Sequence, residues 1–342
     1  MQHGAQPLEL STDPEKQQLV GRPASHASHA SHARPAVGLA AALLAALLMA
    51  GYLLLGEYFM SNLDNGDPGT FLLGRQLIAS LLMTLLSAAR DGWAMPRRAD
   101  RPRIHLLGLL NFVNAVGFVW GFKLTSAFTT SVMQLSIPVF TLFASVALRE
   151  ESLSFGKLCG VLLVVTGCGF VSVARPAEGG GGHITSFGTG LVVLVLQCFS
   201  FVGIMLLQKR VLEHYPVSLV VAWSYTLCTL WSLLYSAVDG SLTRLPEQFS
   251  SPSKVAIVVY SAVFGAVAYF ELVAFATKHL PATLVAISVA FEPLAVSIAG
   301  LFFSAARTSL LELGGYVTAA VGTTVLALSY HQRLGQTHCE SD

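Results

Sequence analysis

The sequence is poor in charge and lacks the motifs of most enzymes. Charged residues make up 11% of its 342 positions, against about a quarter in globular domains. A net charge of +1 excludes nucleic-acid binding driven by a basic surface. There is no Gly-x4-Gly-Lys-Ser/Thr phosphate loop and no Gly-x-Ser-x-Gly elbow, so we expect neither ATP drive within the chain nor a serine hydrolase. No cofactor is expected, and the chain is predicted not to be an enzyme.

Cysteine and histidine are not arranged for metal binding. Four of the five cysteines lie inside apolar runs and are interpreted as small buried residues rather than disulfides. His26, His29 and His32 recur at a spacing of three in a Ser-His-Ala repeat, but no cysteine or carboxylate supports them. The other histidines lie in loops or at the ends of predicted helices, which argues against an intramembrane enzyme. No metal site is therefore predicted.

Long hydrophobic runs are what the sequence has in abundance. Hydrophobic residues make up 54% of the chain, and each run is long enough to span a bilayer as a helix. No alternating ten-residue strands appear, and backbone groups in lipid need internal partners. We therefore expect an all-α membrane protein with ten transmembrane helices. They are placed near 36–60, 68–89, 104–122, 127–148, 156–174, 187–208, 217–238, 255–276, 282–303 and 309–330.

The second half of the chain repeats the first at an offset of 155 positions. Without any gap, Pro138 aligns with Pro293, and Gly160 and Gly167 align with Gly315 and Gly322. Proline and glycine mark backbone requirements rather than hydrophobicity, so a shared register indicates duplication. The predicted units are a disordered cytosolic tail (1–35), a first five-helix repeat (36–174), a Gly-rich linker (175–186), a second repeat (187–330) and a cytosolic C-terminal tail (331–342).

Lysine and arginine are distributed unevenly between the two predicted sides. With the N-terminus inside, 14 of the 20 lie on the inner side, so both termini are predicted to be cytosolic. Because each half has an odd number of spans, the second repeat begins on the opposite side of the membrane from the first. The two repeats are therefore expected to have inverted orientations. Inverted repeats of this kind place a binding site near the midplane, between the halves. The plasma membrane is favoured over an endomembrane because no organelle signal is visible.

The ordered set of these features resembles the EamA-type family of the drug/metabolite transporter superfamily. In the first repeat the matching residues include Gly56, Pro68, Arg75 and the Arg149-Glu150 pair, followed by the repeated prolines and glycines given above. The resemblance covers residues 36–330 and implies two inverted five-helix repeats and a transporter function. The sequence departs from the usual pattern of this family at two places. Glu57 stands where the family tends to have a small polar residue, and Ser304–Arg307 stands where the family usually has a Gly-Glu pair.

Four ionisable residues lie inside predicted spans, where a charge is costly and commonly faces a cavity or a partner. Glu292 directly precedes Pro293, which frees backbone polar groups. A carboxylate there could bind a cationic group, carry a coupling proton, or join two helices by a hydrogen bond. Glu271 lies mid-span, Glu57 near the end of the first span, and Arg75 in the second. For Arg75 a structural ion pair, with one of the glutamates as partner, is favoured over a site role.

Uncharged polar and aromatic residues add to the candidates. Gln134 lies one turn before Pro138, and the equivalent prolines Pro138 and Pro293 are expected helix breaks. Each of the uncharged candidates could instead serve only as packing between helices. The remaining candidates are Asn111 and Asn114 on one face of the third span, Gln197 in the sixth, and Tyr269, Trp223 and Tyr225 as aromatic walls.

The predicted function is secondary transport of a small polar or amphipathic organic metabolite by alternating access. Proton coupling and facilitated exchange both stay open, as does a receptor or scaffold role without transport. An open channel is disfavoured, because repeated prolines and buried carboxylates suit a gated site. The expected partners are the metabolite, the lipid bilayer and, with coupling, protons; nucleic acid is not expected. Gly156 with Gly160 and the Gly314-Gly315 pair fit close packing within one subunit or a homodimer.

Overall fold

The computed structural model of this chain describes residues 24–62, 67–92, 94–125, 129–130, 133–134, 136–174, 184–289, 291–292, 295–296, 311, 314–315, 317–319, 321–322, 324–325 and 328–329. Within these ranges the secondary structure is helical, with no strand, as expected. Six of the described helices are long and apolar enough to cross a membrane. Their spanning segments are Ala36–Gly56, Pro68–Asp91, Arg101–Leu124, Phe187–Leu212, Val217–Asp239 and Pro252–His279.

The first five helices correspond to the five predicted spans of the first repeat. They are α2 (Ala24–Asn62), α3 (Pro68–Asp91), α4 (Arg101–Leu124), α6 (Ser136–Ala147) and α7 (Phe155–Ala174). Helix α2 begins 12 residues before its predicted span, and α6 begins nine residues after the predicted start. Asp67 caps α3 by accepting a hydrogen bond from Thr70 N at 2.9 Å, and Pro68 follows in the first turn. Residues 24–35, expected to be part of a disordered tail, are helical instead, because alanine at every third position favours helix.

The second half continues with α8 (Ile184–Leu212), α9 (Val217–Asp239), the short α10 (Ser241–Arg244) and the 3₁₀ turn η1 (Leu245–Phe249). The predicted eighth span is one continuous rod of three pieces. It runs from α11 (Pro252–Ala262) through the π-helical segment η2 (Val263–Ala268) into α12 (Tyr269–His279). The wider π-helical turn changes the direction of the carbonyl groups locally. Such turns are common at functional sites.

The predicted fourth and ninth spans are shorter in the described residues than the sequence indicated. The fourth is represented by α6 and the turn before it, and the ninth by α13 (Ala282–Val289) and residues 291–292 and 295–296. Pro138 lies in the first turn of α6, where the missing N–H is tolerated. Pro293 and much of the tenth span lie outside the described residues. Ten membrane-spanning helices therefore remain a prediction.

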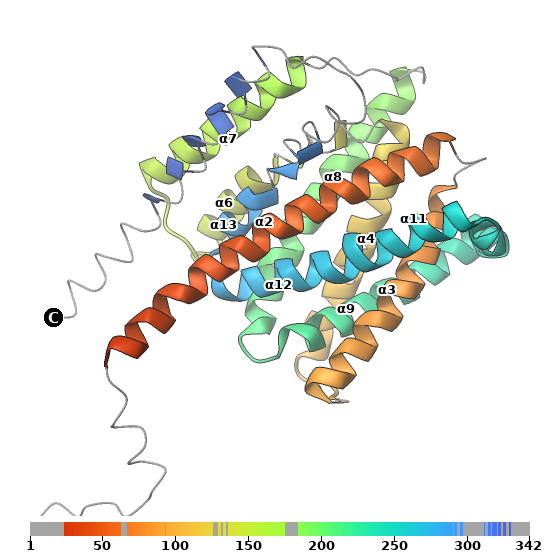
Figure 1. The fold of residues 1–342 in the computed structure, drawn as a ribbon, viewed down its shortest axis with the longest axis horizontal. Coiled ribbons are helices and arrows are strands. Elements are labelled where there is room, and N and C mark those ends of the chain that lie inside the picture. Colours follow the sequence, from red (N-terminus) through yellow and green to blue (C-terminus); the bar gives the residue numbers. More distant parts are fainter. Residues whose placement is uncertain are drawn as a thin grey trace, which may run out of the picture.

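The helices pack in pairs that the duplication relates to one another. The first helix of each repeat packs on the third helix of the other repeat. Thus α2 packs on α12, which belongs to the predicted eighth span, and α8 packs on α4. Second-position helices pair as α3 with α9, and fourth-position helices as α6 with α13. In Figure 1, α3 and α9 lie at one edge of the helix bundle, and α7 lies at the other edge beside the short described pieces between residues 311 and 329.

The α7 pairing is reciprocal, as a two-fold relation between the repeats requires. A Cβ added at Gly167 would lie 2.5 Å from the carbonyl oxygen of Gly315, and one added at Gly322 would lie 2.8 Å from that of Gly160. Because Gly160 aligns with Gly315 and Gly167 with Gly322, each contact is the image of the other. The repeated glycines are therefore explained by a close backbone approach within one chain.

Gly167→Ala is expected to lower the free energy of unfolding by about 1–3 kcal/mol, because backbone atoms cannot move away from the new methyl group. Gly169→Ala is the matched control on the same helix, since a Cβ at Gly169 would meet nothing within 4 Å. Thermal unfolding of both variants in one detergent measures the difference. Equal melting temperatures would contradict the close approach.

The connections between helices collect in two groups at opposite ends of the bundle. At one end Tyr215 donates to Asp100 at 2.8 Å, Lys278 donates to Tyr215 O at 3.3 Å, and Arg210 pairs with Glu150 at 2.8 Å. At the other end Arg244 lies 3.4 Å from Asp67. Interhelical connections predicted to lie on the same side of the membrane therefore contact one another.

Candidate functional site

Arg75 of α3 is the charged centre of the buried region. Its side chain is 3% exposed, and it reaches from the first repeat to the π-helical segment of the second. Nε donates to the carbonyl of Ser261 at 3.3 Å, and an Nη donates to that of Gly265 at 2.9 Å. The guanidinium also lies 4.6 Å from the ring centre of Tyr52, a cation–π contact.

Among the described residues no carboxylate lies within salt-bridge distance of Arg75, so Glu271 and Glu292 do not form the expected ion pair. A pair with Glu57 stays a prediction, because the side chain of Glu57 lies outside the described residues. Backbone carbonyls take that place. Gly265 permits this arrangement, because a Cβ there would lie 2.8 Å from the ring of Tyr52. A sequence pattern does not reveal such a partner, since every residue carries a carbonyl group.

Aromatic side chains enclose the space beside Arg75. Tyr52 stacks on Phe71 and Phe118 at 6.2 and 5.8 Å between ring centres, and Tyr225 meets Phe270 edge-on at 5.2 Å. The cavity between them has a volume of about 10 Å³, room for about one water molecule. It is lined by Met49, Tyr52, Arg75, Asn111, Asn114, Ala115, Phe118, Tyr225 and Phe270.

Three oxygen atoms near this cavity are buried and accept or donate no hydrogen bond within the described part of the chain. They are the hydroxyls of Tyr52 and Tyr225 and Oδ1 of Asn111. The amide nitrogen of Asn111 is already committed to Leu107 O at 2.9 Å. Buried polar atoms normally find partners, so these oxygens indicate a place where a ligand or water completes the structure.

The uncharged candidates meet in one hydrogen-bonded chain. Gln134 Nε2 donates to Gln197 Oε1 at 3.0 Å, and Gln197 Nε2 donates to Asn114 Oδ1 at 2.6 Å. All three side chains are at least 94% buried. These hydrogen bonds join α4, α8 and the turn before α6, so they link the two halves of the protein. Asn111 lies one turn before Asn114 on the same face of α4, and both line the cavity.

Glu292 lies beside this chain and is 1% exposed. Both its carboxylate oxygens are without a hydrogen-bond partner among the described residues. It interacts electrostatically with Tyr269 of α12 and Cys198 of α8, and Tyr269 also interacts with Arg75. Cys198 in turn contacts Gln197 and Met133 O. Tyr269 therefore lies within electrostatic range of both the carboxylate and the guanidinium.

Glu271 and Glu57 are not shown to join this cluster. Glu271 is two residues from Tyr269, which places the two side chains on nearly opposite faces of α12. Its electrostatic neighbours are Arg90 and Asp91, at the end of α3. Oε1 of Glu271 has no partner in the described part. Glu57 lies on α2, but its side chain is outside the described residues.

Two features of the site were missed from the sequence. Tyr52 stands alone in a run of Ala, Leu and Met, and that isolation was its available signal. Glu151 and Lys157 looked like an ordinary loop and helix end, yet they form an ion pair of 2.9 Å at 6% and 3% exposure. Glu151 also accepts from Thr283 Oγ1 at 3.1 Å, so the α6–α7 connection of the first repeat is held to α13 of the second.

Lys157→Met is expected to lower the free energy of unfolding by about 2 kcal/mol or more, because Glu151 would keep a buried charge without this counterion. Arg210→Met is the control, since its ion pair with Glu150 lies nearby but Arg210 is 52% exposed; there the loss should stay below about 1 kcal/mol. Chemical denaturation in mixed micelles gives both values. A smaller effect at Lys157 than at Arg210 would contradict the ranking.

Comparison with known proteins places this arrangement in a family. The model of the EamA-like transporter family matches residues 36–173 and 188–328, one match for each half. The chain belongs to the EamA-like transporter family. A protein of known crystal structure superimposes with a TM-score of 0.69 over 86% of this chain and 98% of its own, at 16% identity, which supports the fold.

Curated relatives of this EamA-like chain match over part of their length. The S-adenosylmethionine uptake transporter of Rickettsia conorii is 26% identical over 151 residues, 44% of each chain. The WAT1-related protein At2g37460 of Arabidopsis thaliana is 27% identical over 176 residues, 45% of this chain and 44% of that protein. The match thus spans less than half the length of these relatives. The family match and the six apolar helices together establish that this is a multi-pass membrane protein with a transporter's fold.

Proposed function

We propose that this chain is a secondary transporter for a small organic solute that carries a positive charge, and that the solute binds between Glu292 and Arg75. Two inverted five-helix repeats would open the site alternately to each side of the membrane. Both termini would face the cytosol, and the plasma membrane is the proposed location. Family membership supports transport; the solute and mechanism rest on the site.

The observation that carries this proposal is the carboxylate of Glu292, buried at 1% exposure with no hydrogen-bond partner among the described residues. An ionised carboxylate in an apolar interior is costly unless a cation or donors compensate it. A solute ammonium or sulfonium group would supply that compensation. A proton would do so too, which keeps proton coupling open beside facilitated exchange.

The rest of the site favours a solute with more than one recognition group. Arg75 donates two of its five N–H groups to carbonyls and lines the cavity, so it can also take a carboxylate. The aromatic rings around Tyr52 and Phe270 suit a flat ring. S-adenosylmethionine, in the Rickettsia relative's name, combines a sulfonium, an amino-acid group and an adenine ring, so it heads the candidates.

The small cavity supports a mechanism in which the repeats must move. A volume of about 10 Å³ holds a water molecule and no metabolite, so binding requires the helix pairs to separate. The contacts that cross between repeats at one end, including Glu151 with Thr283, would then break when the site opens on that side. The equivalent helix pairs give both openings a similar geometry.

The deciding experiment is thermal stabilisation of the purified chain by separate panels of cationic, zwitterionic, anionic and neutral metabolites, followed by counterflow in vesicles. We expect a selective hit among cations or zwitterions with a ring, and counterflow of that compound. Stabilisation without counterflow would favour a receptor or scaffold instead. A hit confined to anions or neutral sugars would contradict the role given to Glu292.

A further inference from the structure

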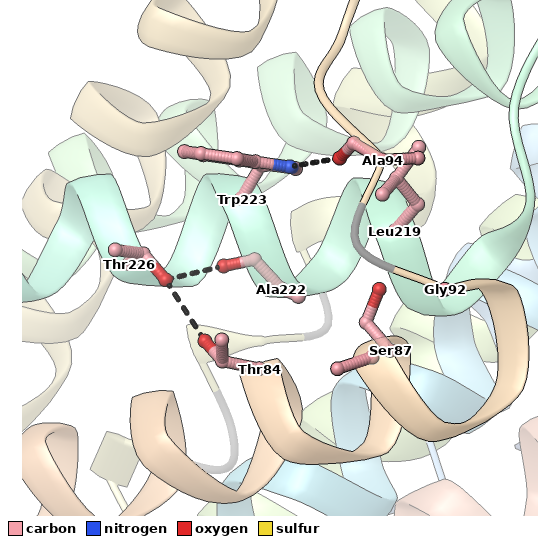
Figure 2. A pocket seen from close by; sticks show the side chains of 9 residues that line it. Thr84, Ser87, Gly92, Ala94, Leu219, Ala222, Trp223 and Thr226 are labelled. Carbon is pink, nitrogen blue, oxygen red and sulfur yellow. Dashed lines mark hydrogen bonds between the residues drawn. The ribbon is translucent and has the colours of Figure 1, made fainter.

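A second cavity, of about 210 Å³, lies away from the polar cluster, between α3 and α9. Figure 2 shows it between the two helices, with Gly92 and Ala94 among the residues that line it. Thr84, Ala88 and Thr226 are half-buried and Gly92 and Ala94 are exposed, so the cavity reaches the surface. It is lined by Thr84, Ser87, Ala88, Gly92, Ala94, Leu219, Ala222, Trp223 and Thr226.

The polar atoms that its walls contain are largely engaged with one another. The hydroxyls of Thr84 and Thr226 lie 3.3 Å apart, and Thr226 also donates to Ala222 O at 2.8 Å. The indole N–H of Trp223 donates to Ala94 O at 3.1 Å. Methyl, methylene and ring surfaces remain. Such a lining fits an alkyl chain better than a polar metabolite.

The surface around the cavity has the features of a membrane interface. Leu81 and Leu85 of α3 and Leu230 and Leu234 of α9 are 52–61% exposed, which fits a face turned toward lipid. Trp223 lies near the end of the helix pair, where tryptophan is common at the boundary of hydrocarbon and headgroups. The cavity therefore begins at headgroup level and follows the lipid-facing side of α3 and α9.

Charge next to the cavity is strongly positive. The segment 90–103, which contributes Gly92 and Ala94 to the walls, carries five arginines and two aspartates. Both aspartates are engaged, Asp91 with Ser218 and Asp100 with Arg103 and Tyr215. The arginines Arg90, Arg97, Arg98, Arg101 and Arg103 are all exposed. A negative group placed at the mouth of the cavity would meet a basic surface on one side.

We propose that the groove between α3 and α9 binds one anionic phospholipid of the inner leaflet. One acyl chain occupies the cavity of about 210 Å³, and the phosphate lies against the arginines of segment 90–103. The apolar lining of the cavity recognises the acyl chain, and the arginines recognise the negative charge of the headgroup. This site is separate from the solute site and does not depend on the transported compound.

The test uses the delipidated full chain and measures lipid binding by native mass spectrometry with phosphatidylglycerol and phosphatidylcholine of identical acyl chains. We expect phosphatidylglycerol to bind at least tenfold more tightly. The combined change Arg97→Gln, Arg98→Gln and Arg101→Gln should weaken its binding about 100-fold, since each basic side chain near a membrane surface contributes about fivefold. Lys123→Gln, Arg244→Gln and Lys254→Gln together make the control, with the same charge change at the opposite end.

The acyl-chain contact is tested by filling the cavity. Ala88→Phe should reduce phosphatidylglycerol binding about tenfold, whereas Ala89→Phe, on the exposed neighbouring position, should leave it unchanged. Equal binding of the two lipids would overturn the proposal, and so would the same loss in the Ala89 variant. If Ala88→Phe does not fold, the lipid comparison and the arginine variant decide the outcome alone. None of these readouts requires transport, so a failure here differs from a failure of the proposed function.

Discussion

Glu292→Gln is expected to reduce uptake of the stabilising solute about 100-fold and to remove its thermal stabilisation. The change keeps the size of the side chain but deletes the charge that would compensate a cation. A hydrogen bond to a charged group contributes about 1.5–3 kcal/mol, and each 1.4 kcal/mol corresponds to a tenfold change in affinity. The protein should remain folded, because a neutral amide costs less to bury than a carboxylate. Uptake and stabilisation are measured on the same preparation.

Counterflow and pH-driven uptake separate the two roles open to Glu292. If it binds the solute cation, counterflow and pH-driven uptake both disappear in Glu292→Gln. If it carries a coupling proton, counterflow survives and only the drive by a pH gradient is lost. Glu271→Gln is the matched control, since Glu271 lies on another face of its helix, near Arg90 and Asp91. Wild-type uptake, stabilisation and pH dependence in Glu292→Gln would contradict both roles.

Arg75→Met is expected to abolish measurable uptake and to lower the free energy of unfolding by about 3 kcal/mol. The variant loses two hydrogen bonds from a charged donor, to the carbonyls of Ser261 and Gly265, and the cation–π contact with Tyr52. These contacts join α2, α3, α11 and η2. The loss is measured by denaturation in one detergent at several denaturant concentrations.

Arg75→Lys should be nearly as harmful as Arg75→Met, because a single ammonium group cannot reproduce the planar fork that serves two carbonyls. Tyr52→Phe is the control, since it keeps the ring under the guanidinium and removes a hydroxyl that is buried without a partner in the described part. Its stability should equal or exceed that of the wild type. A stable, active Arg75→Lys protein would show that charge alone suffices.

Much of the candidate site was predictable because helical spacing and polarity act locally. Gln134, Asn114 and Gln197 each stood out as polar residues in apolar spans, and the structure joins them in one chain. Glu292 stood out in the same way and is buried next to that chain. Burial of a polar side chain in lipid is costly, so its presence alone indicates a partner or a ligand.

Other parts of the site required the three-dimensional arrangement. The partners of Arg75 are backbone carbonyls, which no side-chain pattern marks. Glu271 and Glu292 are both carboxylates inside predicted spans, yet they have different neighbours, because position along a helix does not determine which helix packs on which face. The burial of Glu151 and Lys157 depends on α13 lying against the α6–α7 connection, a contact between segments far apart in the chain.

The sequence by itself determined that this is a duplicated all-helical membrane protein, because hydrophobic length, proline and glycine register and charge asymmetry are properties of the chain. The register of the glycines even anticipated a contact, since Gly167 with Gly315 and Gly322 with Gly160 are equivalent pairs. Only the tertiary structure decided which polar residues meet. Hydrogen bonds and ion pairs act over a few ångströms, and the packing of helices from different repeats alone brings groups that close.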